Sequence, residues 1–242
     1  VELACGGMTL TGERISGKED AAAIAAACEG SAAILQTVER REKSEKAPAL
    51  YDLTTLQRDA NRTLGYTAQQ TLDYLQALYE KKLCTYPRTD SRYLTDDMEN
   101  AVPMLVSAAA VICGVDAPET ALASQVCSSK NVTDHHAVVP TKSAADADLA
   151  ALPQGEREIL RLVSLGLLRA VCPPHRYAET SLTAECGGHR FTAKGKAVLD
   201  MGWRVYAAPS KDAALPDGLA EGQSLAVDAV QVKEGKTTPP KH

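Results

Sequence analysis

The sequence TYPRTDS at residues 85–91 directly follows two predicted helices and places a tyrosine two positions before an arginine. Because a residue before proline is pushed toward extended conformations, Tyr86 should leave the preceding helix in an extended segment. Side chains alternate along an extended chain, so Tyr86, Arg88 and Asp90 are expected to share one face. The run therefore predicts a short connector that presents a phenol, a guanidinium and a carboxylate together.

Tyr86 and Arg88 are the residue types that a tyrosine nucleophile acting on a phosphodiester requires. A phenol has a pKa of about 10 and attacks poorly until its surroundings favour the phenolate. A fixed guanidinium favours the phenolate and pairs with phosphate oxygens as charge develops. Thr89 and Ser91 could donate further hydrogen bonds to phosphate, and Asp90 could orient Arg88 or cap a helix. Spacing alone leaves an alternative open, a turn with a half-buried tyrosine and an exposed ion pair, because Tyr-x-Arg is a weak pattern.

Two helices are predicted before this run from their capping signals and apolar spacing. Residues 52–57 open the first, which carries Leu56 and Leu64 on one apolar face and ends at Gly65. Residues 67–70 have the pattern of a capping box and begin the second helix. The tyrosine connector is therefore expected at the end of a helical pair.

The order of the predicted elements along the whole chain is strands, then helices, then strands. Short strands and an alanine-rich helix over 18–28 occupy the first part, and Gly187-Gly188 is a hairpin signal in the last part. The most economical fold class is α+β. In it, residues 1–53 and 176–242 form a discontinuous β-rich hinge or gate domain, and residues 54–175 form an inserted, mainly helical domain that carries the tyrosine.

Composition restricts the partners and the compartment. The net charge of −5 over 242 residues argues against a general nucleic-acid coat protein. Residues 54–93 hold six basic and four acidic side chains, so this part of the chain is weakly positive. A pair of solvent-exposed helices would give much the same count. Seven cysteines without a Cys-x-x-Cys pair argue against a disulfide framework or zinc ribbon and favour a reducing cytosol. The sequence shows no membrane-spanning apolar run and no signal peptide.

Four stretches in a fixed order resemble the type IA DNA topoisomerases, and bacterial topoisomerase III in particular. They are LCTYPRTDSRYL at 83–94, DHHAVVPT at 134–141, FTAKG and the following residues to Gly-Trp at 191–203, and TTPP at 237–240. The first resembles the family's catalytic segment and the second its histidine motif. The resemblance covers essentially all of the chain, and it implies the same β-rich hinge with a helical tyrosine domain.

The resemblance also implies a reaction. Tyr86 would attack a phosphodiester of single-stranded DNA, become joined to the 5′ phosphate and free a 3′ hydroxyl, so that religation needs no ATP. Arg88 would stabilise the crowded phosphate. His135 or His136 would contact phosphate or assist proton transfer; alignment favours His135, while adjacency leaves His136 open. A loop histidine satisfied by backbone carbonyls is the alternative.

Further side chains carry weaker expectations. Gln57 and Arg58 lie on the first predicted helix and would face either the phosphate backbone or solvent. Tyr66, Tyr74, Tyr79 and Tyr93 could stack on bases, but the helical spacing of Tyr74 and Tyr79 favours the core for those two. Trp203 is expected in a strand of the β-rich domain.

The resemblance further implies that the full-length enzyme uses Mg²⁺ bound by an acidic cluster in a domain absent from this sequence. No metal ligand is therefore assigned, and this chain is expected to bind none. It starts at Val1 without methionine and stops directly after 237–240, so we expect a central piece of a longer protein.

The partners expected from these arguments are single-stranded DNA and the other domains of the same chain, and not a membrane. We expect a monomer, located in the bacterial cytoplasm at the nucleoid. The isolated piece should lack full topoisomerase activity. The alternative is a non-catalytic module for single-stranded DNA binding or gating. A tyrosine recombinase would need several gathered arginines, and a relaxase would need a histidine triad; the sequence shows neither pattern.

Overall fold

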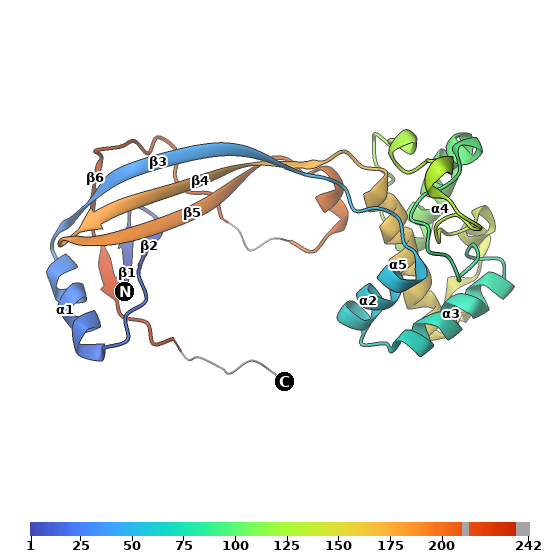
Figure 1. Ribbon diagram of the computed structural model, residues 1–242, viewed down its shortest axis with the longest axis horizontal. Coiled ribbons are helices and arrows are strands. Elements are labelled where there is room, and N and C mark those ends of the chain that lie inside the picture. The colour runs from blue at the N-terminus through green and yellow to red at the C-terminus, as the bar shows by residue number, and fades with distance from the viewer. Residues whose placement is uncertain (210–212, 236–242) are drawn as a thin grey trace. The chain divides into compact units, whose positions relative to one another are not determined.

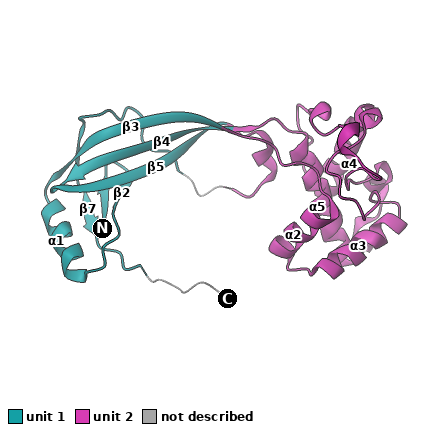
Figure 2. Ribbon diagram, viewed as in Figure 1, with its two compact units in different colours: residues 1–43, 176–199, 210–242 teal, residues 44–175, 200–209 magenta. Residues whose placement is uncertain are grey.

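The computed structural model describes residues 1–209 and 213–235 (Figure 1). The chain combines helices and strands and divides into two compact units (Figure 2). The β-rich unit takes residues 1–43, 176–199 and 210–242, and the helical unit takes residues 44–175 and 200–209. The TTPP motif at 237–240 lies outside the described residues.

One antiparallel-paired sheet organises the β-rich unit. Within the described residues its strand order is β6-β3-β4-β5-β2-β1-β7. The strands are β1 (Glu2–Cys5), β2 (Met8–Gly12), β3 (Ala32–Glu45), β4 (His175–Cys186), β5 (His189–Asp200), β6 (Ser224–Ala226) and β7 (Ala229–Gln231). Leu3 lies opposite Leu10 and Gly12 opposite Phe191 in the register. These apolar side chains share one buried cluster with Cys28 of α1 (Lys18–Cys28), so alternation along the strands buries one set of residues.

The turn between β4 and β5 is set by two glycines, as the sequence predicts. Gly187 and Gly188 have φ values of 57° and 77°. A two-residue hairpin whose twist matches its strands needs positive φ at both central positions, and glycine adopts such angles at low cost.

Four helices form most of the helical unit, and short 3₁₀ turns connect them. The helices are α2 (Leu53–Leu64), α3 (Ala68–Glu80), α4 (Val102–Cys113) and α5 (Gln154–Ala170). The 3₁₀ turns are η1 (Asp96–Ala101), η2 (Ala123–Gln125), η3 (Ser129–Asn131), η4 (Lys142–Asp146), η5 (Leu149–Ala151) and η6 (Gly202–Tyr206). Helix α5 contacts α2, α3 and α4, and its Ile159, Leu160 and Val163 are fully buried. Among the described residues, every helix is too short or too polar to cross a bilayer.

The predicted starts of α2 and α3 are confirmed as capping boxes. The Asp52 carboxylate accepts a hydrogen bond from the Thr55 backbone N–H at 2.6 Å, and Thr55 Oγ1 accepts from the Asp52 N–H at 3.3 Å. Thr67 and Gln70 make the same reciprocal pair at α3. Helix α2 ends at Gly65 in the left-handed conformation, as the sequence predicts. These caps fix the helical pair from which the tyrosine connector leaves.

Two details differ from the sequence-based expectations. Residues 44–53 lie with the helical unit, because Leu50 and Tyr51 are buried there and Tyr51 pairs with Val138. Trp203 is not in a core strand: β5 ends at Asp200, and Trp203 lies half-buried in η6 of the helical unit. The reason is local, since Met201 already has helical angles (φ −63°, ψ −35°) and Gly202 follows with φ 47°.

Candidate active site

The connector that carries Tyr86 pairs with the second motif, about fifty residues further along the chain. The Thr85 backbone N–H donates to Val139 O and the Thr141 N–H donates to Leu83 O, both at 3.0 Å. The Thr85 hydroxyl donates to Ala137 O and accepts from the Val139 N–H, again at 3.0 Å. The two motifs found in the sequence therefore lie side by side and satisfy each other's backbone groups.

The ring of Tyr86 lies against two aromatic neighbours. The His135 ring centroid is 4.2 Å from it with the planes tilted by 40°, and Tyr79 of α3 packs edge-on at 5.5 Å and 82°. Tyr86 is half-buried and His135 is exposed. Within the described residues no hydrogen bond engages the Tyr86 hydroxyl. The ring is thus held in place while its oxygen remains available to a substrate.

The residues after Tyr86 alternate between buried and exposed, as an extended segment predicts. Pro87, Thr89 and Ser91 are buried, whereas Arg88 and Asp90 are exposed. Asp90 does not pair with Arg88; its carboxylate accepts a hydrogen bond from the Thr133 hydroxyl at 2.9 Å. In the part of the chain that the structure describes, no acid forms an ion pair with Arg88. Its guanidinium is therefore free to meet an anion from outside the protein.

Thr89 and Ser91 use their hydroxyls inside the protein. Thr89 Oγ1 donates to His135 O at 2.8 Å and accepts from the Ser91 N–H at 3.0 Å. The Ser91 hydroxyl bonds the backbone of Tyr93 and Asn131. We therefore correct the expected role of both: they hold the connector against the histidine loop instead of donating to phosphate.

The two histidines occupy different environments. The His135 ring packs against the Tyr86 ring, whereas His136 is half-buried and its Nδ1 lies 2.9 Å from Ala137 O. Of the two histidines, only His135 therefore contacts the predicted nucleophile.

The start of the connector is held by a turn that the sequence did not indicate. Lys82 adopts φ 62°, the left-handed region that side chains rarely occupy. Its carbonyl accepts hydrogen bonds from the Thr141 and Ser143 hydroxyls at 2.6 and 3.0 Å. The next residues enter the core, where burial raises the pKa of the Cys84 thiol and keeps it neutral. Cys84 is thus a packing residue beside the site.

No metal donor set accompanies this arrangement. Among the described residues, no three His, Cys, Asp or Glu side chains are grouped so that they could hold a metal ion. The residues present do not fit the magnesium site that the resemblance implies for the full-length enzyme, so each step below rests on side chains of this chain.

Comparison with known proteins agrees with the paired motifs. A protein-family model described as DNA topoisomerase matches residues 6–242. DNA topoisomerase 3 of Bacillus licheniformis is 38% identical over 232 residues, which cover 90% of this chain and 32% of that protein. The same enzyme of Bacillus subtilis is 37% identical over 233 residues, which cover 88% and 31%. This chain belongs to the type IA DNA topoisomerases.

The fold agrees with that family as well. The structure of full-length topoisomerase I from Thermotoga maritima matches with a TM-score of 0.74, covering 99% of this chain and 40% of that one. At 20% sequence identity this likeness concerns the fold. The chain spans about a third of the length of the curated type IA relatives it matches.

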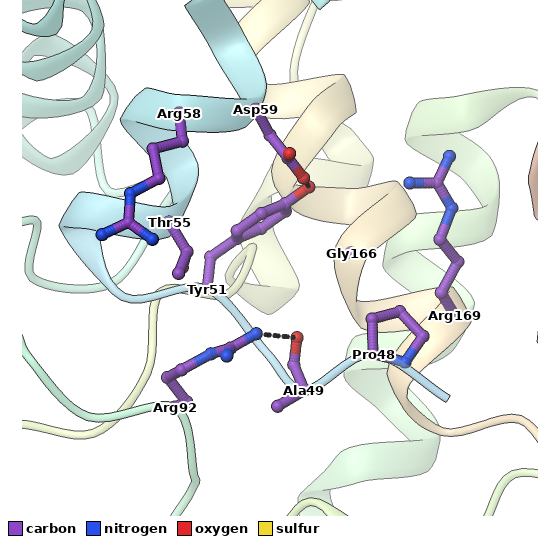
Figure 3. Close-up of a pocket in the computed structure, with 9 residues that line it drawn as sticks. All are labelled: Pro48, Ala49, Tyr51, Thr55, Arg58, Asp59, Arg92, Gly166 and Arg169. Atoms are coloured by element: carbon purple, nitrogen blue, oxygen red, sulfur yellow. Dashed lines mark hydrogen bonds between the residues drawn. The ribbon is translucent and has the colours of Figure 1, made fainter. Parts of the chain in front are cut away.

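Among the described residues, no contact brings the remaining predicted residues, Gln57 and Arg58, to Tyr86. Gln57 is half-buried, and its Nε2 donates to Ala68 O at 3.0 Å, which ties α2 to the start of α3. This bond gives Gln57 a part in helix pairing, and its contact with DNA stays a prediction. Arg58 is exposed and lines a separate pocket with Arg92 and Arg169 (Figure 3). Sequence patterns did not group these arginines, because each lies on a different element.

Tyr79 is the site residue that sequence analysis missed. It was expected in the core, but its side chain is 39% exposed and its edge meets the Tyr86 ring. Its position in the last turn of α3, directly before the connector, is the signal that could have found it. Tyr74, in contrast, packs against Tyr66 and the adjoining core.

We predict that Thr89→Val destabilises the 242-residue chain, because it leaves the buried Ser91 N–H and the part-buried His135 carbonyl without their partner. The expected loss is about 1–3 kcal/mol of unfolding free energy. Urea unfolding followed by circular dichroism measures it. Thr133→Val removes a hydroxyl from the same loop whose bond to Asp90 is exposed to solvent, and it should therefore change stability by less than about 0.5 kcal/mol. Equal effects of the two substitutions would contradict the structural role of Thr89.

Proposed function

We propose that this chain is the strand-cleaving part of a type IA DNA topoisomerase and that Tyr86 is its nucleophile. One observation carries the proposal: a phenol with an unengaged hydroxyl is packed against His135, two residues before an arginine that no described acid neutralises. A structural tyrosine of this exposure would more commonly bond its hydroxyl to the protein. The resemblance to the family implies that the substrate is a single DNA strand.

The proposed step is a transesterification, in which one phosphate ester bond forms as another breaks. Tyr86 Oη forms a bond to phosphorus while the bond from phosphorus to the 3′ oxygen breaks. The phenolic proton leaves and the 3′ oxygen gains one, so the products are a 5′-phosphotyrosine and a 3′ hydroxyl. One phosphodiester replaces another, and religation by the reverse step therefore needs no ATP. Arg88 stabilises the crowded phosphate, since a planar guanidinium can grip two oxygens.

His135 is the second group beside the reacting centre. It lies against the Tyr86 ring, and its backbone is fixed by Thr89. We propose that it contacts a phosphate oxygen or moves a proton at the leaving oxygen. We assign this part to His135 and not to His136, because it is the His135 ring that packs against Tyr86.

A second candidate function is supported by the extent of the chain. It spans about a third of its relatives, and its described residues offer no donor set for magnesium. By itself this piece would then be a single-stranded DNA-binding or gating module without turnover. The first candidate describes the whole enzyme and the second describes this piece in isolation, so the two are compatible.

We predict that Tyr86→Phe in the full-length enzyme binds single-stranded DNA but yields no covalent adduct, because the attacking oxygen is gone. The measurement is denaturing gel electrophoresis of a labelled oligonucleotide trapped with the enzyme. Tyr74→Phe is the matched control, since it removes a phenol from the same helical unit and should leave the adduct yield unchanged. Normal adduct from the Tyr86 variant would refute the assignment.

We predict that Arg88→Lys slows adduct formation by roughly tenfold, the effect of losing one charge-assisted hydrogen bond worth about 1.5 kcal/mol. Binding at low salt should weaken only modestly, because the charge is retained. Single-turnover cleavage rates at saturating DNA separate the two effects. An unchanged rate would show that Arg88 does not grip the reacting phosphate.

We predict that the 242-residue chain alone does not relax supercoiled plasmid, with or without magnesium. Phosphoryl transfer needs more positive charge at the leaving oxygen than one arginine supplies. The resemblance implies that another domain of the full-length enzyme supplies the rest of this charge. Agarose gels of plasmid incubated with the chain give the measurement. Ladders of relaxed topoisomers that disappear with Tyr86→Phe would show that this piece carries a complete active site.

A further inference from the structure

The helical unit contains a second hollow that the proposed chemistry does not use. It has a volume of about 230 Å³ and is lined by three arginines from three elements (Figure 3). Arg58 comes from α2, Arg92 from the connector six residues after Tyr86, and Arg169 from the last turn of α5. Residues far apart in sequence thus converge on one pocket.

Two of the three guanidinium groups are held by backbone carbonyls. Arg92 donates from Nε to Leu50 O at 2.9 Å and from Nη2 to Ala49 O at 3.3 Å. Arg169 donates from Nε to Tyr206 O at 2.9 Å. Carbonyls orient a guanidinium without neutralising its charge, and each group keeps further N–H donors. Arg58 is exposed, and no described residue forms a hydrogen bond or ion pair with its side chain.

The acid in this pocket is already occupied. Asp59 accepts from the Tyr51 hydroxyl at 2.7 Å through Oδ2, and its Oδ1 pairs with Arg62 at 2.9 Å. Burial, and then the bond to Asp59, raise the pKa of Tyr51, so its phenol remains a neutral donor. Three lining cations therefore face one carboxylate that has two other partners, and the pocket carries net positive charge.

The positive lining continues into a neighbouring hollow. This second cavity, of about 420 Å³, shares Pro48, Ala49 and Arg92 with the first. Its charged lining residues are Lys46 and Arg92, both basic. A ligand with several negative charges in a row could contact both hollows, whereas a single small anion would occupy one.

We propose that the pocket of Arg58, Arg92 and Arg169 binds phosphate groups in the backbone of a single nucleic acid strand, separately from the Tyr86 cluster. Guanidinium groups match phosphate oxygens in geometry and keep their charge at any physiological pH. The shared lining of two basic hollows favours a strand over a free nucleotide. This inference rests on the proposed function in one respect: it takes the negatively charged ligand to be DNA.

Arg58 gives the cleanest test, because its side chain supports no other described residue and alanine suits a helix. The matched control is Arg161→Ala, which removes an exposed arginine of α5 that is absent from the pocket. Thermal unfolding should show both variants folded. Fluorescence anisotropy with a labelled single strand of about 15 nucleotides, between about 50 and about 200 mM salt, gives affinity and its salt dependence.

The expected result is a several-fold loss of affinity for Arg58→Ala, with the slope of log K against log salt smaller in magnitude by about 0.7, the value for one lost phosphate contact on a single strand. Arg58→Glu should weaken binding further, and Arg161→Ala should match the unchanged chain. A methylphosphonate strand, which lacks backbone charge, should bind Arg58→Ala and the unchanged chain equally.

Two results would overturn the proposal. One is the same affinity and salt slope for Arg58→Ala and Arg161→Ala. The other is binding of thymidine monophosphate that depends on Arg58 while strand binding does not, which would assign the pocket to a free nucleotide. Either failure is distinct from failure of the proposed function, because adduct formation through Tyr86 is measured separately in the full-length enzyme with Arg58 unchanged.

Discussion

The pairing of the tyrosine connector with residues 135–141 is the interaction on which the site depends. The connector has no regular secondary structure, and yet its backbone groups lie next to the core, where an unpaired N–H or carbonyl would cost about 1–3 kcal/mol. Thr85, Val139 and Thr141 supply the missing partners across the two segments. This pairing, together with the bond from the Thr89 hydroxyl to the His135 carbonyl, fixes Tyr86 relative to His135.

The same pairing joins the two apolar cores of the helical unit. Val138 belongs to the cluster formed with α2 and α3, while its neighbours Ala137 and Val139 belong to the cluster formed with α4. Leu83 packs in the first cluster and Leu94, at the other end of the connector, in the second. Both segments are therefore anchored by burial on each side, which gives an irregular stretch the order that a helix or strand would otherwise provide.

Burial also separates the residues that hold the site from those that can act on a substrate. Thr89 and Ser91 lie on the inward face and use their hydroxyls within the protein. Arg88 lies on the outward face, and the Tyr86 hydroxyl has no bond to the described residues. Buried and exposed residues alternate from Pro87 to Ser91, although the chain bends at Pro87 and Arg88. In the arginine pocket, by contrast, backbone carbonyls orient guanidinium groups and leave their positive charge available to a ligand.

Local sequence determined much of this protein by itself. Capping boxes at Asp52 and Thr67, the left-handed stop at Gly65 and the glycine hairpin turn follow from residues a few positions apart, and the structure confirms them. The mixed fold and the family also followed from motifs in the chain, and the comparisons confirm both. The predicted nucleophile was chosen from one short run, and it stays a prediction for the experiments above.

Only the tertiary structure decided which side chains meet. It placed His135 against Tyr86, brought Tyr79 out of the expected core, and gave Gln57, Thr89 and Ser91 hydrogen-bond partners within the protein. It moved Trp203 out of the predicted strand and gathered three arginines from distant elements. The physical reason is that helix and turn signals arise from short-range hydrogen bonding and backbone angles. Contacts between segments fifty or more residues apart depend instead on packing that no local pattern encodes.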